Sequence, residues 1–423
     1  SLDPGVSALL VFDGVWGRVF EVAGFASSRG LNVFSIDFLD ASVEVGLACG
    51  VVGLEALVGA RLARLKASSA SSAPVRVSLG KVVSRRDLLR LGPVAALEYL
   101  NRPVVDWESC QTLPSCRLCV ESCPERALSG KPPSVNYDAC TLCGVCFSIC
   151  PVEAIHSPQT PPGAVEAYIE ALREATGEPL IAIVAGYEDL VDLRALKCTG
   201  YPTVVLPFWS LSEITPLSLL RMASRGFTPI IYAKSSVPKH ILELEQLGAV
   251  RVARSIEELQ AKIAVGPVYS PRPRSDTPRG FALEVLGSLG GDIQLSFPGA
   301  GIVGVDPNLC TLCGVCAKTC PAGALSLVEE GSYTKLLFEP SNCIGCRECE
   351  TICPEKAIKV TWAYRKSVER TLVESPIARC IECGAPIGPE ALIKSVERRL
   401  ERAGIKPKHT RLCQACKAKQ LLL

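Results

Sequence analysis

Two stretches of the sequence, CTLCGVCFSICP at 140–151 and CTLCGVCAKTCP at 310–321, place four cysteines and a proline at identical spacing. The same order of cysteines recurs at 343–354, and again at 110–124, where five residues rather than two follow the first cysteine. Four residues after the last cysteine of each copy stands an alanine with an aliphatic neighbour. These pairs are Ala127-Leu128, Ala154-Ile155, Ala324-Leu325 and Ala357-Ile358. The chain therefore repeats one local motif four times, in two pairs.

The spacing C-x2-C-x2-C-x3-C-P resembles that of the bacterial-type two-cluster ferredoxins, once in 107–160 and once in 301–365. In that family three closely spaced cysteines hold one cubane, while the fourth, at the start of a helix, ligates the other cluster. Proline suits the next position because its φ is preset and its missing N–H has no helical partner there. The alanine and its aliphatic neighbour are expected to pack beneath the cubanes.

The resemblance implies four [4Fe-4S] clusters with crossed ligation. The predicted ligands are Cys110, Cys116, Cys119 and Cys150 for cluster one; Cys140, Cys143, Cys146 and Cys123 for cluster two; Cys310, Cys313, Cys316 and Cys353 for cluster three; and Cys343, Cys346, Cys349 and Cys320 for cluster four. Structural zinc at the C-x2-C pairs is the alternative. Because of the insertion at 111–115, the sequence does not decide whether Cys110 is a ligand. Without Cys110, cluster one would be a three-iron cluster.

Two other segments alternate apolar runs with helical patterns, which is typical of a parallel sheet covered by helices. In the first, apolar runs at 8–12 and 31–34 flank a helical stretch. The second, 165–265, predicts four strands and four helices. The strands are expected at 180–185, 203–208, 229–233 and 249–253, and the helices at 187–196, 214–225, 238–247 and 255–264. The sequence does not decide whether the two segments share one sheet.

The stretch 215–232 weakly resembles the small α/β domain of the electron-transfer subunit that joins a hydrogenase to heterodisulfide reductase. That domain carries cysteines for a two-iron cluster, whereas 179–265 contains one cysteine, Cys198. The resemblance thus implies a scaffold or docking role. No G-x-G-x-x-G follows a strand, so a nucleotide is not expected, and a flavin held by another kind of loop is the alternative.

Two further C-x2-C pairs, made by Cys380, Cys383, Cys413 and Cys416, bracket a charged helical stretch near the C-terminus. They predict a four-cysteine zinc ribbon at 375–423, with a rubredoxin-like iron as the alternative. The stretch 394–419 is rich in lysine and arginine. We interpret it as a solvated helix face or a patch for an acidic partner, and we expect no nucleic acid.

Of the 22 cysteines, 20 lie in these clusters, and Cys49 and Cys198 stand alone. Tight C-x2-C repeats in a long chain indicate metal ligation rather than a disulfide framework, so we expect a reducing, cytoplasmic compartment. A lone cysteine is more often a buried apolar residue than a reactive thiol. The histidines, His156, His240 and His409, show no ligand spacing and are expected to be surface or hydrogen-bonded residues.

These patterns together predict a chain of α/β plus α+β class, in which parallel-sheet α/β segments are combined with two ferredoxin-like dicluster modules and a C-terminal zinc ribbon. The expected divisions are an N-terminal α/β segment at 1–80, a helical linker at 81–106, module one at 107–160, an α/β domain at 165–265, a proline-rich linker at 266–300, module two at 301–365 and the ribbon at 375–423. The stretch SRRDLLR at 84–90 resembles a twin-arginine signal only superficially, and we interpret Ser84 as a helix N-cap. No apolar run reaches the ~20 residues of a transmembrane helix, although peripheral association with a membrane complex is compatible with the sequence.

No acid–base pair, nucleophile or substrate-binding metal site is evident, so the sequence predicts a non-catalytic polyferredoxin. It would pass electrons between partner subunits of a larger oxidoreductase of the hydrogenase or heterodisulfide-reductase type. The 45 lysines and arginines match 43 aspartates and glutamates, a balance that suits a stationary subunit better than a diffusing carrier. The alternatives are a self-contained iron–sulfur flavoprotein or disulfide-linked reductase with its chemistry in the α/β segment, and a redox-sensing regulator.

Overall fold

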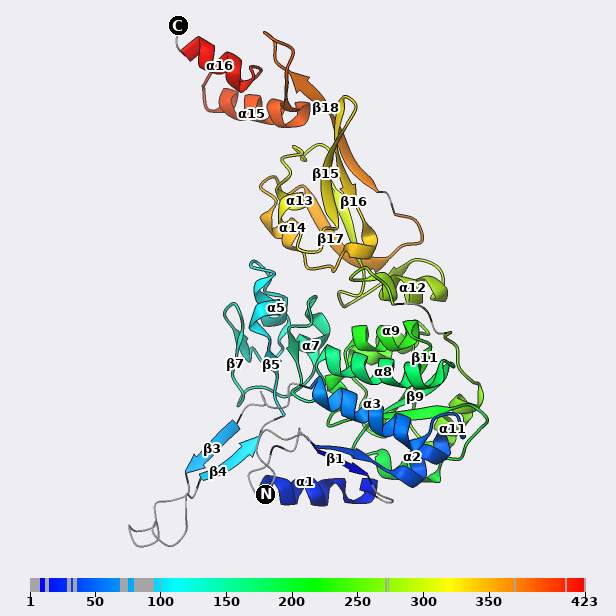
Figure 1. The fold of residues 1–423 in the computed structure, drawn as a ribbon. Helices are drawn as coiled ribbons and strands as arrows, with labels where there is room; N and C mark the ends of the chain where they lie inside the picture. Colours follow the sequence, from blue (N-terminus) through cyan, green and yellow to red (C-terminus); the bar gives the residue numbers. More distant parts are fainter. Residues whose placement is uncertain are drawn as a thin grey trace. The chain divides into compact units, whose positions relative to one another are not determined.

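The computed structural model describes residues 8–11, 15–28, 32, 36–68, 75–79, 95–99, 101–270, 272, 274–368, 370–407 and 409–421. The chain divides into two compact units (Figure 1). The first comprises Ser1–Gln111, Arg117–Arg274 and Glu284–Leu289, and the second comprises Thr112–Cys116, Ser275–Leu283 and Gly290–Leu423. Within the described ranges, no helix combines the length and the apolarity that crossing a bilayer requires.

The centre of the first unit is a parallel four-stranded sheet in the order β10-β9-β11-β12. Its strands are β9 (Leu180–Gly186), β10 (Thr203–Phe208), β11 (Phe227–Tyr232) and β12 (Arg251–Ala253). Every residue of β9, β10 and β11 is buried, as expected for a parallel sheet covered on both faces. The sequence prediction of four parallel strands in this segment is therefore confirmed.

Helices connect and cover these strands close to the predicted positions. They are α8 (Pro162–Thr176), the 3-10 helices η4 (Leu190–Ala195) and η5 (Leu211–Glu213), α9 (Pro216–Ser224), α10 (Lys239–Gln246) and α11 (Ile256–Ala264). Side-chain caps fix two of the helix starts. The Thr215 hydroxyl accepts from the Ser218 N–H, and the Ser255 hydroxyl accepts from the Glu258 N–H. Each cap satisfies a backbone donor that has no partner within its helix.

The N-terminal segment forms the predicted β-α-β arrangement. It contains β1 (Ala8–Val11), η1 (Val15–Arg18), α1 (Val19–Ser28), β2 (Ile36–Leu39), α2 (Ala41–Leu47) and α3 (Leu54–Lys66). Strand β2 pairs in parallel with β1. It begins at Ile36, after the apolar run 31–34 noted in the sequence, and the structure describes only Asn32 of that run. Val15, Trp16 and Phe38 share one buried core with Ile181 and Val205. The two α/β segments therefore form a single domain.

A buried ionic network also joins the two segments. The side chains of Arg61 and Arg64 on α3 are at most 1% exposed. The Arg61 guanidinium donates to the Glu44 carboxylate at 3.0 Å and to the Val205 carbonyl at 2.9 Å. Both arginines also pair with Asp37, at 3.3 and 3.4 Å. Because these charges have left water, each depends on its partners, and the network holds α3 against the end strand β10.

Residues 95–99, which the sequence placed in a helical linker, instead form strand β4 (Ala95–Tyr99). This strand pairs antiparallel with β3 (Val75–Leu79). The prediction of a helical linker is wrong for these residues, because pairing with a distant strand overrides a local preference for helix. The predicted N-cap at Ser84 lies outside the described residues.

The first cysteine-rich segment is built from short elements. Strands β5 (Val104–Val105) and β8 (Ile155–His156) pair antiparallel, as do β6 (Leu128–Ser129) and β7 (Ser134–Val135). The helices are α5 (Trp107–Gln111), α6 (Leu118–Ser122) and α7 (Val145–Ile149). Helices α6 and α7 each end at a cysteine that precedes a proline, Cys123 and Cys150.

The second unit repeats this plan with longer strands. Helix α12 (Gly280–Leu289) is divided between the two units. The other elements of the second unit are β13 (Ile293–Gln294), β14 (Gly301–Val305), α13 (Val315–Thr319), β15 (Leu325–Glu330), β16 (Tyr333–Phe338), η6 (Pro340–Asn342), α14 (Glu348–Ile352), β17 (Ile358–Tyr364), β18 (Thr371–Arg379), β19 (Pro386–Pro389), α15 (Glu390–Arg402) and α16 (Gln414–Leu421). Strand β18 pairs with β16 on one side and with β19 on the other, and it leads toward α15 (Figure 1). One sheet thus continues from the second module into the C-terminal cysteine segment.

Candidate metal centres

The four Cys-Pro turns have the same local geometry. The sulfur of the last cysteine accepts a hydrogen bond from the backbone N–H of the alanine four residues later. The donor–acceptor pairs are Ala127 to Cys123, Ala154 to Cys150, Ala324 to Cys320 and Ala357 to Cys353, at 3.2, 3.2, 3.2 and 3.3 Å. All four alanines are buried. An N–H aimed at sulfur stabilises the thiolate, which is the form of cysteine that binds metals, so the repeated alanine belongs to a turn suited to metal binding.

The backbone explains why the turns agree so closely. The residue before each alanine has left-handed φ, between 50° and 63°, at Arg126, Glu153, Gly323 and Lys356. That conformation directs the alanine N–H back toward the cysteine sulfur. Only the third copy uses glycine, and the other three place a long polar side chain in this less favoured region.

Three pockets bring cysteines of paired motifs together. Cys123 lines one pocket with Cys140, Cys143 and Cys146. Cys353 lines another with Cys310, Cys313 and Cys316. Cys320 lines the third with Cys343, Cys346 and Cys349. These are the quartets that crossed ligation predicts for clusters two, three and four, and ligation itself stays a prediction.

The quartet predicted for cluster one differs from the other three quartets in its backbone. Cys110 and Cys150 are buried and share a small apolar cluster with Ala154. In the other motifs the loop between the second and third cysteines contains a left-handed residue, at Gly144, Gly314 and Arg347. In the loop from Cys116 to Cys119, Arg117 has a φ of −131° and Leu118 begins α6. The longer spacing after Cys110 thus accompanies a different loop.

The chemistry of the pockets fits a cationic iron–sulfur core. Burial, together with neighbouring thiols, raises the pKa of Cys316 and of Cys343 to about 11. Burial likewise raises the pKa of Cys346 to about 12. Four buried thiolates cannot gather without a compensating positive charge, which a metal core supplies when bound. Around the pocket lined by Cys353, the apolar side chains of Leu327, Leu336 and Ile358 would exclude water.

The C-terminal cysteines have a tighter arrangement. The sulfurs of Cys380, Cys383, Cys413 and Cys416 all lie within 4.8 Å of one another, and those of Cys383 and Cys413 are 3.5 Å apart. Tetrahedral zinc with Zn–S bonds of ~2.3 Å places its ligand sulfurs ~3.8 Å apart. In the described part of the chain, this is the one group of His, Cys, Asp or Glu side chains whose ligand atoms are so close. The site therefore suits a single ion.

Arg411 holds the two halves of this site together. Its guanidinium donates to both carboxylate oxygens of Glu390 and of Glu397 on α15, at 2.8 to 3.2 Å. The Arg411 carbonyl accepts from the Ile381 N–H at 3.1 Å, next to the first C-x2-C pair. Helix α15 thus fixes the separation of the two cysteine pairs.

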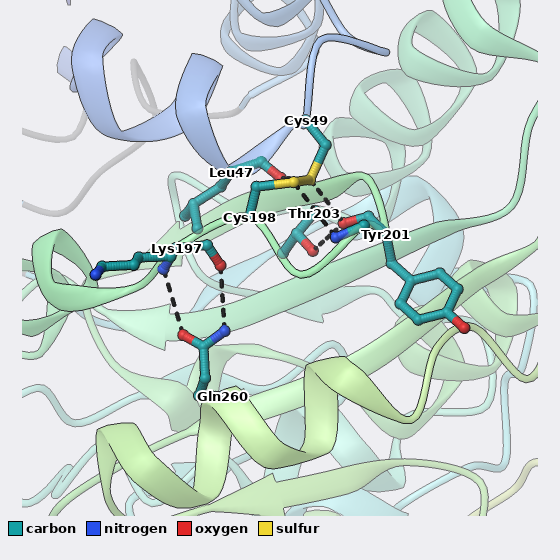
Figure 2. Close-up of a disulfide and its surroundings, with 8 residues drawn as sticks. Leu47, Cys49, Lys197, Cys198, Tyr201, Thr203 and Gln260 are labelled. Atoms are coloured by element: carbon teal, nitrogen blue, oxygen red, sulfur yellow. Dashed lines mark hydrogen bonds between the residues drawn. A yellow bond between two sulfur atoms is a disulfide. The ribbon is translucent and has the colours of Figure 1, made fainter.

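The sequence missed one pairing of cysteines. Cys49 and Cys198, which the sequence left as isolated residues, form a disulfide across 149 residues (Figure 2). Cys198 is exposed rather than buried, so the prediction of a buried apolar cysteine is wrong for it. No local signal could have found the pair, because its members lie in different segments of the sequence.

The histidines behave as expected. The rings of His156 and His240 are buried, and they hydrogen-bond the carbonyls of Ser157 and Ile214 at 3.0 and 2.9 Å. His409 is exposed.

Comparison with known families matches both cysteine-rich regions. The family described as "4Fe-4S dicluster domain" matches residues 309–357, which contain all eight cysteines of the second module. The family described as "4Fe-4S binding domain" matches residues 133–156, which contain the motif beginning at Cys140. The motif at 110–124, which has the longer spacing between its first two cysteines, precedes residues 133–156.

Similar proteins include several ferredoxins. The chain is 31% identical over 88 residues to pyruvate synthase subunit PorD of Thermotoga maritima. This match covers 20% of this chain and 85% of that protein. It is 33% identical over 66 residues to ferredoxin-3 of a Nostoc species, covering 12% of this chain and 68% of that protein. It is 45% identical over 56 residues to the ferredoxin-type protein NapF of Haemophilus influenzae, covering 11% of this chain and 32% of that protein.

The extent of these matches differs between relatives. The chain spans about a third of NapF, and 9% of the acetyl-CoA decarbonylase/synthase complex subunit alpha 1 of Methanosarcina barkeri, with 33% identity over 70 residues. It spans most of ferredoxin-3 of the Nostoc species and of PorD of Thermotoga maritima. The repeated Cys-Pro turns, the cysteine-lined pockets and these matches agree, and the chain belongs to the dicluster ferredoxin family.

Proposed function

We propose that this chain is an electron-transfer subunit with four [4Fe-4S] clusters, which passes electrons between partner subunits of a larger oxidoreductase. The observation that carries this proposal is the fourfold Cys-Pro turn with its N–H to sulfur hydrogen bond. Three of the four turns place their cysteine in a pocket with three cysteines of the paired motif. The predicted crossed ligand sets therefore stand as the proposed iron ligands.

Cluster one is proposed to be held by Cys110, Cys116, Cys119 and Cys150. Cys110 is included because it is buried beside Cys150 and its sulfur accepts a hydrogen bond from the Lys131 ammonium at 3.1 Å. A buried sulfur with a cationic donor is stabilised as a thiolate, which is the form that binds iron.

The α/β domain is proposed to act as a brace and a docking body rather than as an active site. Its sheet strands are fully buried, and its two sequence segments are joined by a common core and by the Arg61 network. A domain built in this way can carry a redox module at a fixed place within an assembly.

The partner is proposed to be the catalytic subunit of a hydrogenase-type or heterodisulfide-reductase-type complex. The proposed location is the cytoplasm, either free of membranes or in peripheral association with a membrane complex. Relatives named as subunits of pyruvate synthase and of the acetyl-CoA decarbonylase/synthase complex support membership in a multi-subunit enzyme. The C-terminal site is proposed to hold one zinc ion, which would stabilise the segment through its four thiolates.

Anaerobic affinity purification of the full chain from its native source tests the proposal. We expect a catalytic oxidoreductase subunit to co-purify, and its substrate to bleach the iron–sulfur absorbance of this chain. Cys143→Ser, which alters a proposed ligand of cluster two, should slow that bleaching, whereas Arg18→Met, at the exposed last residue of η1, should not. Absence of an oxidoreductase partner, or clusters that stay oxidised beside a working partner, would contradict the proposal.

A further inference from the structure

The disulfide between Cys49 and Cys198 lies at the surface of the α/β domain. Cys49 stands in the turn after α2, and Cys198 stands in the loop between η4 and β10 (Figure 2). Cys198 is exposed, whereas Cys49 is half-buried. A thiolate approaching from solvent therefore reaches the Cys198 sulfur more readily than the Cys49 sulfur.

The surroundings of the two sulfurs also differ in polarity. The Gly200 N–H points at the Cys198 sulfur at 3.4 Å. The carbonyl oxygens of Leu47 and Tyr201 each lie 3.4 Å from the Cys49 sulfur. After reduction the N–H would stabilise a Cys198 thiolate, whereas the carbonyls would accept the Cys49 S–H and hold that sulfur as a thiol.

The loop that carries Cys198 has supports besides the disulfide. Gln260 on α11 accepts from the Lys197 N–H at 3.3 Å and donates to the Lys197 carbonyl at 3.2 Å (Figure 2). The Thr203 hydroxyl donates to the Tyr201 carbonyl at 3.1 Å. On the other side, α2 is held by the bond between Glu44 and Arg61 at 3.0 Å. Because both segments stay anchored, opening the S–S bond leaves the sulfurs close enough to rejoin.

The redox setting favours reversibility. The other 20 cysteines are unbridged, and they lie in quartets suited to metals, which require reduced thiolates. In a compartment that keeps those thiolates reduced, an exposed disulfide is transient or functional more often than it is structural.

We propose that Cys49 and Cys198 form a thiol–disulfide exchange site for an external dithiol, with Cys198 as the exchanging sulfur. A thiolate of the dithiol attacks the Cys198 sulfur, a new S–S bond forms, and Cys49 leaves as a thiolate that takes up a proton. The second thiolate of the dithiol then attacks the dithiol's first sulfur in the mixed disulfide and releases Cys198 as a thiolate. The dithiol is oxidised to a disulfide and the protein pair gains two electrons, while one of the dithiol's two protons goes to Cys49 and the other to solvent. The reverse sequence returns both electrons to an external disulfide.

The test uses the full, anaerobically prepared chain with its clusters intact. The protein is equilibrated with mixtures of reduced and oxidised glutathione, alkylated, and analysed by peptide mass spectrometry. We expect Cys49 and Cys198 to pass together from fully bridged to fully alkylated within the range of these mixtures. A pair that stays bridged in every mixture is a structural disulfide, and a pair that never bridges is not a redox site; either outcome overturns the proposal.

Two single variants test the assigned roles, with the iron–sulfur absorbance and the far-ultraviolet circular dichroism as checks of folding. In Cys49→Ser, the remaining Cys198 should form a mixed disulfide with oxidised glutathione about tenfold faster than Cys49 does in Cys198→Ser, because exposure and thiolate stabilisation both favour Cys198. Equal rates, or faster reaction of Cys49, would overturn the assignment of Cys198 as the exchanging sulfur.

Discussion

The Lys131 ammonium lies 3.1 Å from the sulfur of Cys110 and 2.8 Å from the carbonyl oxygen of the same residue. A cation beside a ligand sulfur stabilises the extra negative charge of a reduced cluster, so it raises the reduction potential. The potential of cluster one is thus expected to depend on the charge of Lys131.

Replacing Lys131 with methionine should therefore lower the midpoint potential of cluster one by ~30–60 mV. This corresponds to the loss of about 1 kcal/mol of charge-assisted hydrogen bonding for a one-electron couple. Lys131→Arg is the matched control, because it keeps the charge. Potentiometric titration followed by electron paramagnetic resonance measures the shift. An unchanged potential in Lys131→Met would show that Cys110 is not bound to the cluster.

The crossed arrangement of the motifs makes Cys123 a proposed ligand of cluster two, not of the cluster nearest to it in sequence. Cys123→Ser should perturb the spectroscopic signature of the site that contains Cys140, Cys143 and Cys146, since these four residues line one pocket. Cys150→Ser should perturb the other site of the same module. Mössbauer spectra of the two variants compare these outcomes, and a change confined to the cluster of Cys116 and Cys119 in Cys123→Ser would refute crossed ligation.

The buried network around Arg61 should dominate the stability of the α/β domain. Arg61→Met leaves Glu44 without its 3.0 Å partner and weakens the pairing of Asp37 in a buried site, so we expect a loss of about 3–5 kcal/mol. Arg18→Met is the control, because the Arg18–Glu21 pair is exposed and should contribute less than about 1 kcal/mol. Urea unfolding, followed by the fluorescence of the core residue Trp16, measures both. Similar losses for the two variants would contradict this account.

His240 should make the same domain sensitive to acid. Burial lowers the pKa of His240 to about 4, while in the unfolded chain the pKa returns to its usual value of about 6.5. As pH falls through this window the unfolded state binds the proton first, so stability decreases on acidification, by up to about 3 kcal/mol. His240→Gln keeps a donor for the Ile214 carbonyl but does not titrate, so its stability should depend less on pH between 7 and 5. Identical pH profiles for the two proteins would exclude His240 as the cause.

Much of the fold follows from local patterns in the sequence. The strands β9 and β10 begin where expected, because each is a continuous apolar run that a parallel sheet buries on both faces. Helices α9 and α11 begin at Thr215 and Ser255, whose hydroxyls are strong capping groups. The Cys-Pro turns could likewise be predicted, because the last cysteine, the proline and the alanine of each turn lie within five residues of one another.

The remaining features depend on contacts between distant segments. Arg61 and Arg64 lie in the sequence LEALVGARLARLK, where charged residues normally face solvent, and only the partners Asp37 and Glu44 explain their burial. The bond between Cys49 and Cys198 depends on the packing of two segments 149 residues apart. The continuation of β18 across the expected boundary between the second module and the C-terminal segment likewise required its partners β16 and β19.

The central claim is that this single chain carries four cubanes. The most direct measurement is the iron and acid-labile sulfide content of anaerobically prepared, full-length protein. Four [4Fe-4S] clusters require about 16 iron atoms and about 16 sulfides per chain. A value near 8 of each would contradict the account, because it would show that only two of the four cysteine quartets bind a cluster.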